Sequence, residues 1–332
     1  TSPLFMSITT VIDMNNGDVN PFELFGSRRD QLSLFSAHVQ KLVLLAEQAY
    51  ETTDSDRSII RANLESTLTR FYTDRGMWYH NAKENQDRLR IVGIPHDHVP
   101  RLQLFVAYLD QRHKQLSQAS ARDDEELHAY SVLSAVFKNL LNNNGDLFNT
   151  ITSSSIDSVG RMQRVIYDFS SLQLRGAGIA MAQFVNVLAY ATSSLGKGDS
   201  LFIHGAELIS PGVRDYMTVQ LDHLRRRQGR GVWGYGKIDK ALDDAPFNEI
   251  VKADYTVLGA LTPVQLEHYQ KVPVDMQGVI TQRGRGYSFL RRGATNVVFD
   301  RDLPLGLSAS SRDPGAMTVP GRSRAVGTSG GK

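Results

Sequence analysis

Strand-like and helical patterns occupy separate zones of this chain, and their order limits the folds that it can adopt. An apolar, β-branched run ends at Asp13, and residues 28–150 then show only helical spacing. Between residues 155 and 300, short apolar runs alternate with helical patterns. Such alternation is typical of a mostly parallel sheet flanked by helices. We therefore expect an α/β domain made from residues 1–27 and 151–305, with an all-helical insertion subdomain at residues 28–150.

The insertion contains four apolar stripes with helical periodicity. They run from Leu32 to Ala49, Ile59 to Phe71, Leu102 to Leu109 and Leu127 to Leu141. Ser27 and Asp30 are placed to cap the first helix, and the Asn-Asn-Asn-Gly run at residues 142–145 is expected to end the last one. No strand pattern interrupts these stripes, so the zone is predicted to be helical throughout.

Strands and helices are expected to alternate in the later part of the chain, within a sheet covered on both faces. The expected strands are Arg164 to Phe169, Leu201 to His204, Gly231 to Tyr235, Tyr255 to Leu258, Gly286 to Leu290 and Asn296 to Phe299. The expected helices are Ile179 to Leu195, Val213 to Arg227, Phe247 to Ala253 and Pro263 to Tyr269. Residues 306–332 contain few large apolar side chains and much Ser, Gly, Pro and Arg, which is typical of a disordered tail.

Composition excludes several classes of protein. The 332 residues are 41% apolar and carry a net charge of +2, so no global charge draws the chain toward nucleic acid or anionic lipid. The absence of cysteine excludes disulfides and thiolate metal sites, and it fits a cytosolic protein. No apolar run is long enough to span a bilayer, and no signal-peptide pattern is present. The chain opens almost directly into its first strand, so we expect upstream partner strands to be missing.

Two glycine-rich segments superficially resemble nucleotide-binding loops. Gly196 to Ser200 follows a helix and opens a strand, whereas a working phosphate loop follows a strand and opens a helix. Gly176-Ala177-Gly178 does lie between a strand and a helix, but Met181 occupies the place of the third glycine of a dinucleotide-binding motif. A tight strand-to-helix turn is the favoured interpretation of this second segment.

The segment Pro95-His96-Asp97-His98 offers two imidazoles and a carboxylate to a metal ion. A zinc site needs three or four converging ligands, and this segment alone does not supply them. We therefore interpret it as a solvated loop between helices, and we predict no metal site in the chain.

Three successive arginines end the helix that is expected to begin at Val213: Arg225, Arg226 and Arg227. Cations at a helix C-terminus stabilise the helix, and this structural role is the favoured interpretation. The functional alternative is an arginine finger that reaches a neighbouring subunit's phosphate, or a contact with DNA, because three arginines exceed what capping needs.

A second basic cluster surrounds the aromatic strand expected at Gly286 to Leu290. It contains Arg283, Arg285, Arg291 and Arg292 with intervening glycines. Loops of Arg and Gly beside an aromatic residue fit contact with nucleic acid, and solvated loops have the same composition. Arg285 is the candidate for DNA contact in this cluster.

Asp13 and Asp168 each end an apolar strand. Open α/β sheets place functional carboxylates at this edge. Aspartate is also common as a structural cap where a strand meets a turn. Both interpretations stay open from the sequence alone. No hydrolytic triad is recognisable, because His204 has no nucleophile at an identifiable spacing.

Five short segments within residues 5–305 share residues with one family of motor proteins. They are Ile12-Asp13 with Asn20-Pro21-Phe22-Glu23-Leu24, Val165 to Leu172, Leu201 to Leu208, Val232 to Lys237, and Ala253-Asp254-Tyr255. Together they resemble the motor domain of the HerA/FtsK-like ATPases, and more narrowly the C-terminal domain of the cytoplasmic ATPases that energise conjugative type IV secretion. The resemblance implies a RecA-like fold, ATP with Mg²⁺ in the intact protein, and a hexamer at the inner face of the cell membrane.

Two catalytic motifs of that family are missing or altered. The sequence has no G-x-x-x-x-G-K-[ST] phosphate loop, which the resemblance places upstream of Thr1. On the strand that resembles Walker B, His204 and Gly205 occupy the places of the two carboxylates, although hydrated Mg²⁺ prefers oxygen ligands. Lys237 lies where the family commonly has a glutamine that orients the γ-phosphate. Glu207 is the acid nearest to the altered pair.

The resemblance leaves two interpretations of the chemistry. In the first, the chain is a degenerate motor domain that acts in assembly and coupling within a conjugation apparatus, with sister subunits, other secretion subunits or DNA as partners. In the second, it is an active ATPase fragment with Glu207 or Asp168 on magnesium and Asp13, His204 and Lys237 around the nucleotide. A third class is a stand-alone DNA-binding protein that acts through the arginine clusters.

Overall fold

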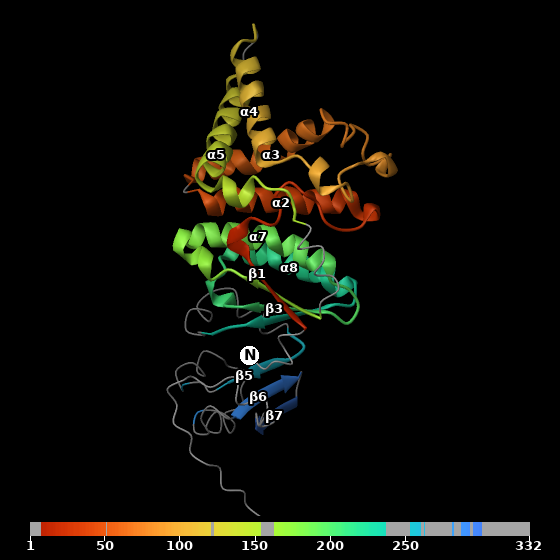
Figure 1. Cartoon of the computed structure of the whole chain (residues 1–332), viewed down its shortest axis with the longest axis vertical. Helices are drawn as coiled ribbons and strands as arrows, with labels where there is room; N and C mark the ends of the chain where they lie inside the picture. The colour runs from red at the N-terminus through yellow and green to blue at the C-terminus, as the bar shows by residue number, and fades with distance from the viewer. Residues whose placement is uncertain are drawn as a thin grey trace, which may run out of the picture. The chain divides into compact units, whose positions relative to one another are not determined.

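The computed structural model describes residues 8–50, 52–120, 123–153, 163–236, 253–259, 262, 281, 287–292 and 295–300. Contacts divide the chain into a larger unit, residues 9–251, and a smaller unit formed by residues 1–8 and 252–332. Each unit is described by itself (Figure 1). The helix expected from Pro263, the helix expected from Phe247 (apart from Ala253) and the tail from residue 306 lie outside the described residues.

Residues 28–150 of the larger unit fold mainly into helices. These are α2 (Gln31–Ala49), α3 (Asp54–Thr73), α4 (Leu102–Ser117) and α5 (Asp124–Phe148), with 3-10 turns at Arg28–Asp30, Gln86–Arg88 and His96–His98. In Figure 1, α4 and α5 form a long hairpin, and α2 lies between this hairpin and α7. A capping box of Thr53 and Asp56 begins α3, and Asp123 accepts two backbone hydrogen bonds at the start of α5. None of the described helices is long and apolar enough to cross a membrane.

Helix α5 does not end at residues 142–145, where the sequence predicted a stop. It kinks at Asn144, whose φ of −138° and ψ of 30° are not helical, and continues to Phe148. Beyond the kink, Leu147 and Phe148 are fully buried. Burying two such side chains contributes about 1.5–3 kcal/mol each, which exceeds the cost of about 1 kcal/mol for a glycine within a helix.

The strands before and after the helical zone pair with each other. β1 (Thr9–Asp13) and β2 (Arg164–Asp168) are parallel neighbours, and Asp13 lies opposite Asp168. After β1, the 3-10 turn Met14–Asn16 ends at Gly17, whose left-handed conformation brings the chain within contact distance of α5. Strands from both sides of the helical zone are thus hydrogen-bonded neighbours in one parallel ladder.

A second parallel pair consists of β3 (Ser200–His204) and β4 (Arg230–Gly234). Helix α7 (Ala177–Ser194) joins β2 to β3, and α8 (Pro211–Arg226) joins β3 to β4. The two pairs do not share a hydrogen-bonded ladder among the described residues, so only part of the expected continuous sheet is observed. The strand and helix positions agree with the predicted ones to within about two residues, which is normal for helix ends.

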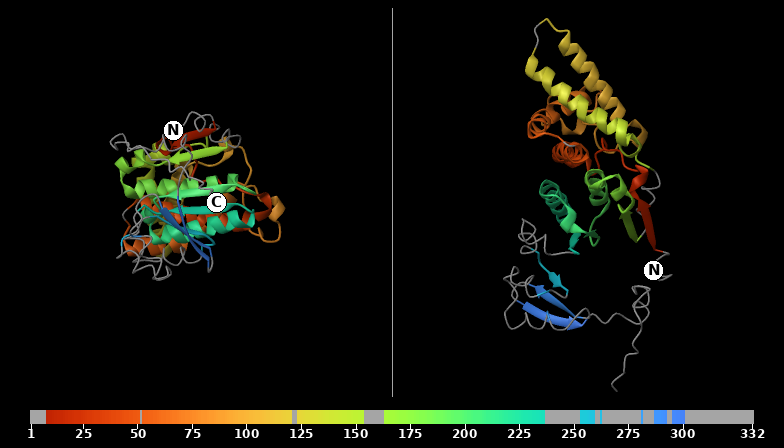
Figure 2. Two further views of the ribbon diagram at one scale, coloured as in Figure 1. Left: turned by 90° about the horizontal axis from the view of Figure 1, so that it is seen from below. Right: turned by 90° about the vertical axis from the view of Figure 1, so that its left-hand side faces the viewer.

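Helices cover one face of both strand pairs, as Figure 2 shows for α7 and α8. On the opposite face, the register partners Val11 and Ile166 are 60% and 36% exposed, and Phe202 and Val232 are 62% and 40% exposed. Parallel sheets are normally buried on both faces. Among the described residues, therefore, the expected two-sided cover is present on one side only.

The last strands form a separate sheet in the smaller unit, which corrects the expectation that they complete the parallel sheet. β5 (Thr256–Leu258), β6 (Tyr287–Arg292) and β7 (Thr295–Asp300) pair in the order β5-β6-β7, and both pairings are antiparallel. Only residues 293–294 separate β6 from β7. A connection this short permits a hairpin but not a parallel crossover, which needs a dozen or more residues.

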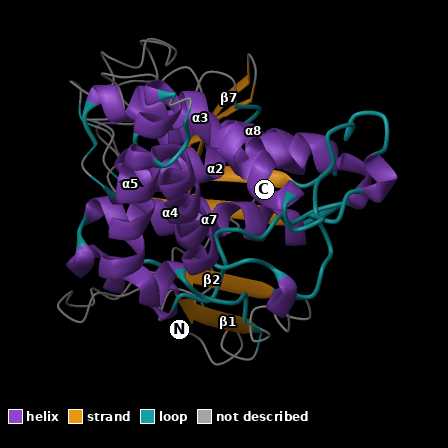
Figure 3. Cartoon of the chain, turned by 90° about the horizontal axis from the view of Figure 1, so that it is seen from above, coloured by secondary structure: helices purple, strands orange, loops and turns teal. Residues whose placement is uncertain are grey.

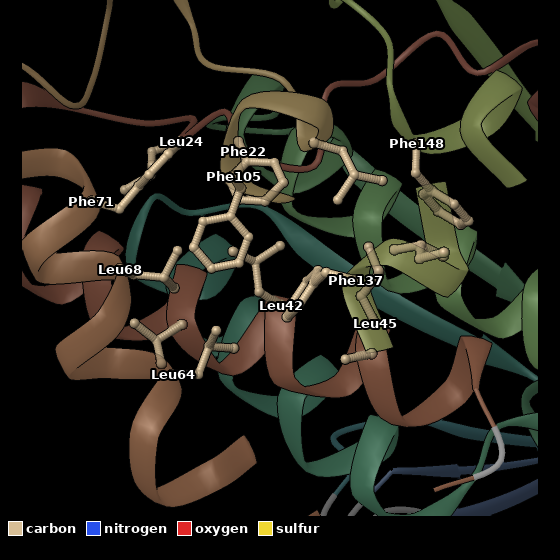
Figure 4. Packing of buried hydrophobic residues seen from close by; sticks show 14 of the residues in the cluster. Phe22, Leu24, Leu42, Leu45, Leu64, Leu68, Phe71, Phe105, Phe137 and Phe148 are labelled. Carbon is tan, nitrogen blue, oxygen red and sulfur yellow. The ribbon is translucent and has the colours of Figure 1, made fainter. Parts of the chain in front are cut away.

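An aromatic cluster joins the segment after β1 to the helical zone (Figure 4). Phe22 lies with its ring centroid 5.1 Å from that of Phe105 in α4 and 6.2 Å from that of Phe71 in α3. Phe105 in turn contacts Phe137 of α5 edge-on at 5.0 Å. Figure 4 also shows Leu42 and Leu45 of α2 and Leu64 and Leu68 of α3 around these rings. Phe22 is therefore a common contact of the strand layer and the helices.

Polar groups of the Asn-Pro-Phe-Glu segment are buried beside this cluster. The Asn20 backbone N–H donates to Thr152 Oγ1 at 3.0 Å, and the Thr152 hydroxyl donates to Glu23 Oε2 at 2.5 Å. His96 Nδ1 lies 2.7 Å from the other Glu23 oxygen. The Asn20 side chain donates to the Pro100 carbonyl at 3.2 Å. This network, which we call the Glu23 network, links chain segments from before, within and after the helical zone.

The backbone of the same segment holds a second set of buried groups. Lys41 Nζ donates to the Glu23 carbonyl at 3.0 Å, and the Tyr72 hydroxyl donates to the Phe22 carbonyl at 3.1 Å. Since the Tyr72 proton is used there, the Tyr72 oxygen accepts from His38 Nε2–H at 3.0 Å. Burial lowers the pKa of His38 well below its ordinary value, with Lys41 as the second cause, so the imidazole is neutral.

Helices α2 and α7 approach closely at one glycine. A Cβ on Gly178 would lie 2.3 Å from the Gln48 carbonyl oxygen in α2. Gly176, just before α7, has a φ of +107°, which favours glycine. The interpretation of residues 176–178 as a tight turn therefore agrees with the geometry, and the second glycine serves helix packing.

Replacing Thr152 with Val should lower the free energy of unfolding by about 2–4 kcal/mol, because two buried partners, the Asn20 N–H and the Glu23 carboxylate, lose their hydrogen bonds. Urea denaturation monitored by tryptophan fluorescence measures this change. The only tryptophans of the sequence, Trp78 and Trp233, both belong to the larger unit. Thr150→Val is the control, because the Thr150 hydroxyl donates only to the adjacent Ile151 carbonyl. Equal effects of the two variants would contradict the role of the Glu23 network.

Gly178→Ala should destabilise the larger unit by about 1–3 kcal/mol through overpacking against Gln48, although Ala normally stabilises a helix. Gly196→Ala serves as the control, because a Cβ there meets no atom within 4 Å. The same urea denaturation measures both. Stabilisation by Gly178→Ala would show that the two helices do not approach as closely as described.

Lys41 should make stability depend on pH. Burial lowers its pKa from 10.5 to about 7. Between these values the unfolded chain binds a proton that the folded chain does not, so stability rises with pH from about 7 toward 10, by at most about 1.4 kcal/mol per pH unit. Lys41→Met should remove this rise. Thermal unfolding of both proteins at pH 7, 8 and 9 measures the difference, and parallel curves would contradict it.

Candidate functional site

The carboxyl ends of the parallel strands hold most of the predicted site residues. Asp13 and Asp168 end neighbouring strands in register. The Asp13 carboxylate accepts from the Ser171 hydroxyl at 2.6 Å and from the Asn15 N–H at 3.0 Å. These bonds, that to Ser171 first, lower the pKa of Asp13 below its ordinary value. Asp168 accepts from the Ser170 N–H at 2.9 Å. The structure thus brings the two acids to one edge and uses both as turn caps.

Strand β3 ends at His204, as the sequence predicted. Gly205 follows with a φ of +73°, and residues 206–208 form a 3-10 turn. The His204 side chain is exposed, and its Nδ1 lies 3.4 Å from the position of a Cβ built on Gly234, its register partner. The end of β3 therefore carries the His204 imidazole and a glycine in the left-handed backbone conformation. Neither residue has a carboxylate side chain.

Glu207 lies on the turn after β3 and contacts the end of β4. Both of its carboxylate oxygens are 3.1 Å from the Gly236 backbone nitrogen, which donates to them. A Cβ on Gly236 would lie 3.0 Å from Glu207 Oε1. Glu207 therefore connects two adjacent loops at the carboxyl edge, next to the residue that the sequence comparison places at the sensor position. Lys237 itself and Arg285 lie outside the described residues.

The acids at the strand ends all accept hydrogen bonds from the backbone. Mg²⁺ is bound through one or two carboxylates with water and phosphate oxygens around it. Asp13, Asp168 and Glu207 each direct an oxygen to a backbone N–H, and no group of three or more His, Asp or Glu residues in the described part of the chain is arranged to hold a metal ion. The described acids therefore do not form a multi-ligand metal cluster.

The arginine cluster divides into three different environments. Arg225 forms an ion pair with Asp222 at 3.4 Å. Arg227 donates to the carbonyls of Thr192 and Ser193 at the end of α7. Arg226 lines a cavity, and its side chain has no hydrogen bond or ion pair to any described residue. Arg227 also donates to the His223 carbonyl at 3.4 Å, so it caps the C-terminal ends of both α7 and its own helix α8.

The remaining candidates from the sequence have structural surroundings. Gly196 to Asp199 forms a turn between α7 and β3, closed by the Gly196 N–H donating to Asp199 at 2.8 Å. This is the reverse of a phosphate loop, as predicted. His96 contacts the buried Glu23 carboxylate at 2.7 Å. The other three residues of this loop are exposed, as expected for a solvated loop, and His96 ties the loop to the Glu23 network.

A cavity of about 650 Å³ lies away from the strand ends and was missed in the sequence. It is lined by one face of α2, by residues 23–30, and by the C-terminal parts of α7 and α8. The signal in the sequence is a polar face at helical spacing on α8, namely Tyr216, Gln220, His223 and Arg227. A lysine within the apolar stripe of α2, Lys41, is a second signal. Figure 3 shows α8, α2 and α7 beside one another, and each pair of them is in contact.

Comparison with known proteins gives a likeness in fold and no match in sequence. No protein-family model and no curated protein sequence matches the chain. Among solved structures, VirB4 of Thermoanaerobacter pseudethanolicus superposes with a TM-score of 0.67 at 17% identity, over 90% of this chain and 78% of that one. The chain thus has a fold similar to that of VirB4, including short parallel strand pairs and helices.

Proposed function

We propose that this chain is a motor-type ATPase domain of a conjugative DNA-transfer (type IV secretion) apparatus, degenerate in its chemistry and acting in assembly and coupling. The observation that supports the motor fold is the VirB4-like arrangement of nearly the whole chain, which agrees with the resemblance of five sequence segments to conjugative ATPases. Fold alone does not establish chemistry, so the proposal also depends on the strand ends.

The strand ends favour the degenerate interpretation. His204 and Gly205 cannot supply the oxygen ligands that Mg²⁺ requires. Glu207, the nearest acid, already accepts from the Gly236 N–H with both oxygens. In this proposal Glu207 fixes the loop after β4 and does not activate water. ATP and Mg²⁺ are cofactors of the related intact motors, and this chain on its own does not hydrolyse ATP.

The partners in this proposal are sister subunits, as a hexamer, and other subunits of the secretion apparatus at the inner face of the cell membrane. DNA is a secondary partner. Two of the three clustered arginines are engaged within the larger unit, because Arg225 pairs with Asp222 and Arg227 binds α7. Only Arg226 of that cluster is left without a partner among the described residues, so an arginine-driven DNA-binding protein is the weaker candidate.

Phosphate release from ATP with Mg²⁺ tests the proposal. The full chain should release phosphate no faster than buffer, and Glu207→Gln and Asp168→Asn should not change this. Glu207→Gln is a conservative variant, since its amide oxygen still accepts from Gly236. Turnover by the wild type that Glu207→Gln abolishes would establish the active ATPase interpretation instead.

Sedimentation velocity and salt-dependent DNA binding complete the test. An assembly role predicts self-association that does not require nucleotide. DNA affinity that falls steeply with salt and persists in the monomer would favour the DNA-binding interpretation. Failure to self-associate at any concentration would contradict the assembly role.

A further inference from the structure

The cavity between α2, α7 and α8 is independent of the strand ends and of the function proposed above. Its volume of about 650 Å³ lies within the range of about 300–1,000 Å³ that is usual for small-molecule sites. Leu24, Phe25, Leu34, Ala37 and Ala189 supply an apolar part of its lining. The rest of the lining is mostly polar, and it includes the cationic side chains Lys41, Arg226 and Arg227. Such a division suits a ligand with an apolar body and one polar end.

Lys41 is the most deeply buried basic group in the lining. The residue is 1% exposed, and Nζ donates a hydrogen bond to the Glu23 carbonyl. An ammonium group has three donors, so two remain. Nζ also lies 6.0 Å from the centroid of the Phe25 ring, which is itself part of the lining. Burying an ammonium is costly. The Glu23 carboxylate offsets part of this cost, and an anion in the cavity would offset more of it.

Two further lining groups are buried with unused hydrogen-bonding atoms. Tyr216 is fully buried, and its hydroxyl has no partner among the described residues. His38 is 3% exposed, and its Nδ1 also has no partner there. Since Nε2 carries the proton that Tyr72 accepts, Nδ1 is a bare acceptor. Buried polar atoms without partners are uncommon in native proteins, and an absent ligand or water is one of the few explanations.

The balance of positive and negative side chains around the cavity favours a ligand with one negative charge. Arg226 and His223 lie at the last turn of α8, and Arg226 has no described partner. Arg227 neutralises the carbonyls at the end of α7, which would otherwise repel an anion. Two acids also line the cavity. Glu23 is engaged with Thr152 and His96, and Asp30 is exposed at the start of α2.

We propose that this cavity is a binding site for a small amphiphilic monoanion, with its carboxylate or similar oxyanion between Lys41, Tyr216 and Arg226 and its apolar body against Phe25 and Leu34. Arg226 supplies a permanent positive charge, the Lys41 amino group takes up a proton beside the bound anion, and the Tyr216 hydroxyl donates a hydrogen bond. The site lies against the C-terminal parts of α7 and α8, whereas nucleotide sites of open α/β sheets lie at the carboxyl ends of the strands. A ligand here would stiffen the contact between α2 and these two helices.

The test uses 4-phenylbutyrate as the probe, its neutral analogue 4-phenylbutyramide, and inorganic phosphate, titrated into the full chain by isothermal calorimetry. Phenylbutyrate should bind once per chain, and the amide and inorganic phosphate should each bind at least about tenfold more weakly. Arg226→Gln should weaken phenylbutyrate about tenfold, whereas the neighbouring Arg225→Gln should change it less than twofold. Arg225 is a matched control, because it faces Asp222 instead of the cavity.

Tyr216→Phe separates binding from folding. Because the Tyr216 hydroxyl has no partner, its removal should leave the unfolding midpoint unchanged or raised while weakening phenylbutyrate several-fold. Equal affinity for the acid and the amide, equal affinity for inorganic phosphate, or binding unaffected by Arg226→Gln and Tyr216→Phe would each overturn the proposal. Absence of saturable binding would overturn it as well.

Discussion

The buried carboxylate of Glu23 is the interaction on which the larger unit most depends. Its two oxygens contact Thr152 and His96, and its backbone carbonyl accepts from Lys41. These groups come from chain segments on both sides of the helical zone and from within it. A buried charge with too few hydrogen bonds is strongly destabilising. The helices and the strand layer are thus obliged to adopt one relative placement, and the aromatic contacts of Phe22 then fill the space between them.

The Glu23 contacts lie on the helical side of the strand layer, and the loops at the carboxyl ends of the strands have other contacts. With the layer fixed from the helical side, the loops at the carboxyl edge are held mainly by local contacts, such as Glu207 with Gly236 and Asp13 with Ser171. A motor needs free carboxylates at this edge to organise Mg²⁺. Here the same acids close turns. In the function proposed above, the fold of a motor is therefore kept without its chemistry.

The sequence was informative where periodicity or local turn chemistry decides the structure. It placed the strands and helices of residues 164–234 and the tight turn at residues 176–178 nearly as they are. Prediction from the sequence was wrong where the structure depends on contacts that the local pattern does not contain. α5 continues past its glycine because Leu147 and Phe148 have a core to enter. β6 and β7 form a hairpin because their connection is short, although alternation suggested a parallel sheet.

The same distinction between local patterns and long-range contacts applies to the candidate sites. Residues at strand ends were recognisable, because an acid after an apolar run marks the edge of a sheet. The cavity was not recognisable, since Lys41 and Tyr216 lie on different helices far apart in sequence and appear there as single polar residues within apolar faces. Their meaning depends on α2 and α8 lining one space. That arrangement in turn depends on Glu23, whose carbonyl accepts the Lys41 ammonium and so keeps it beside the cavity.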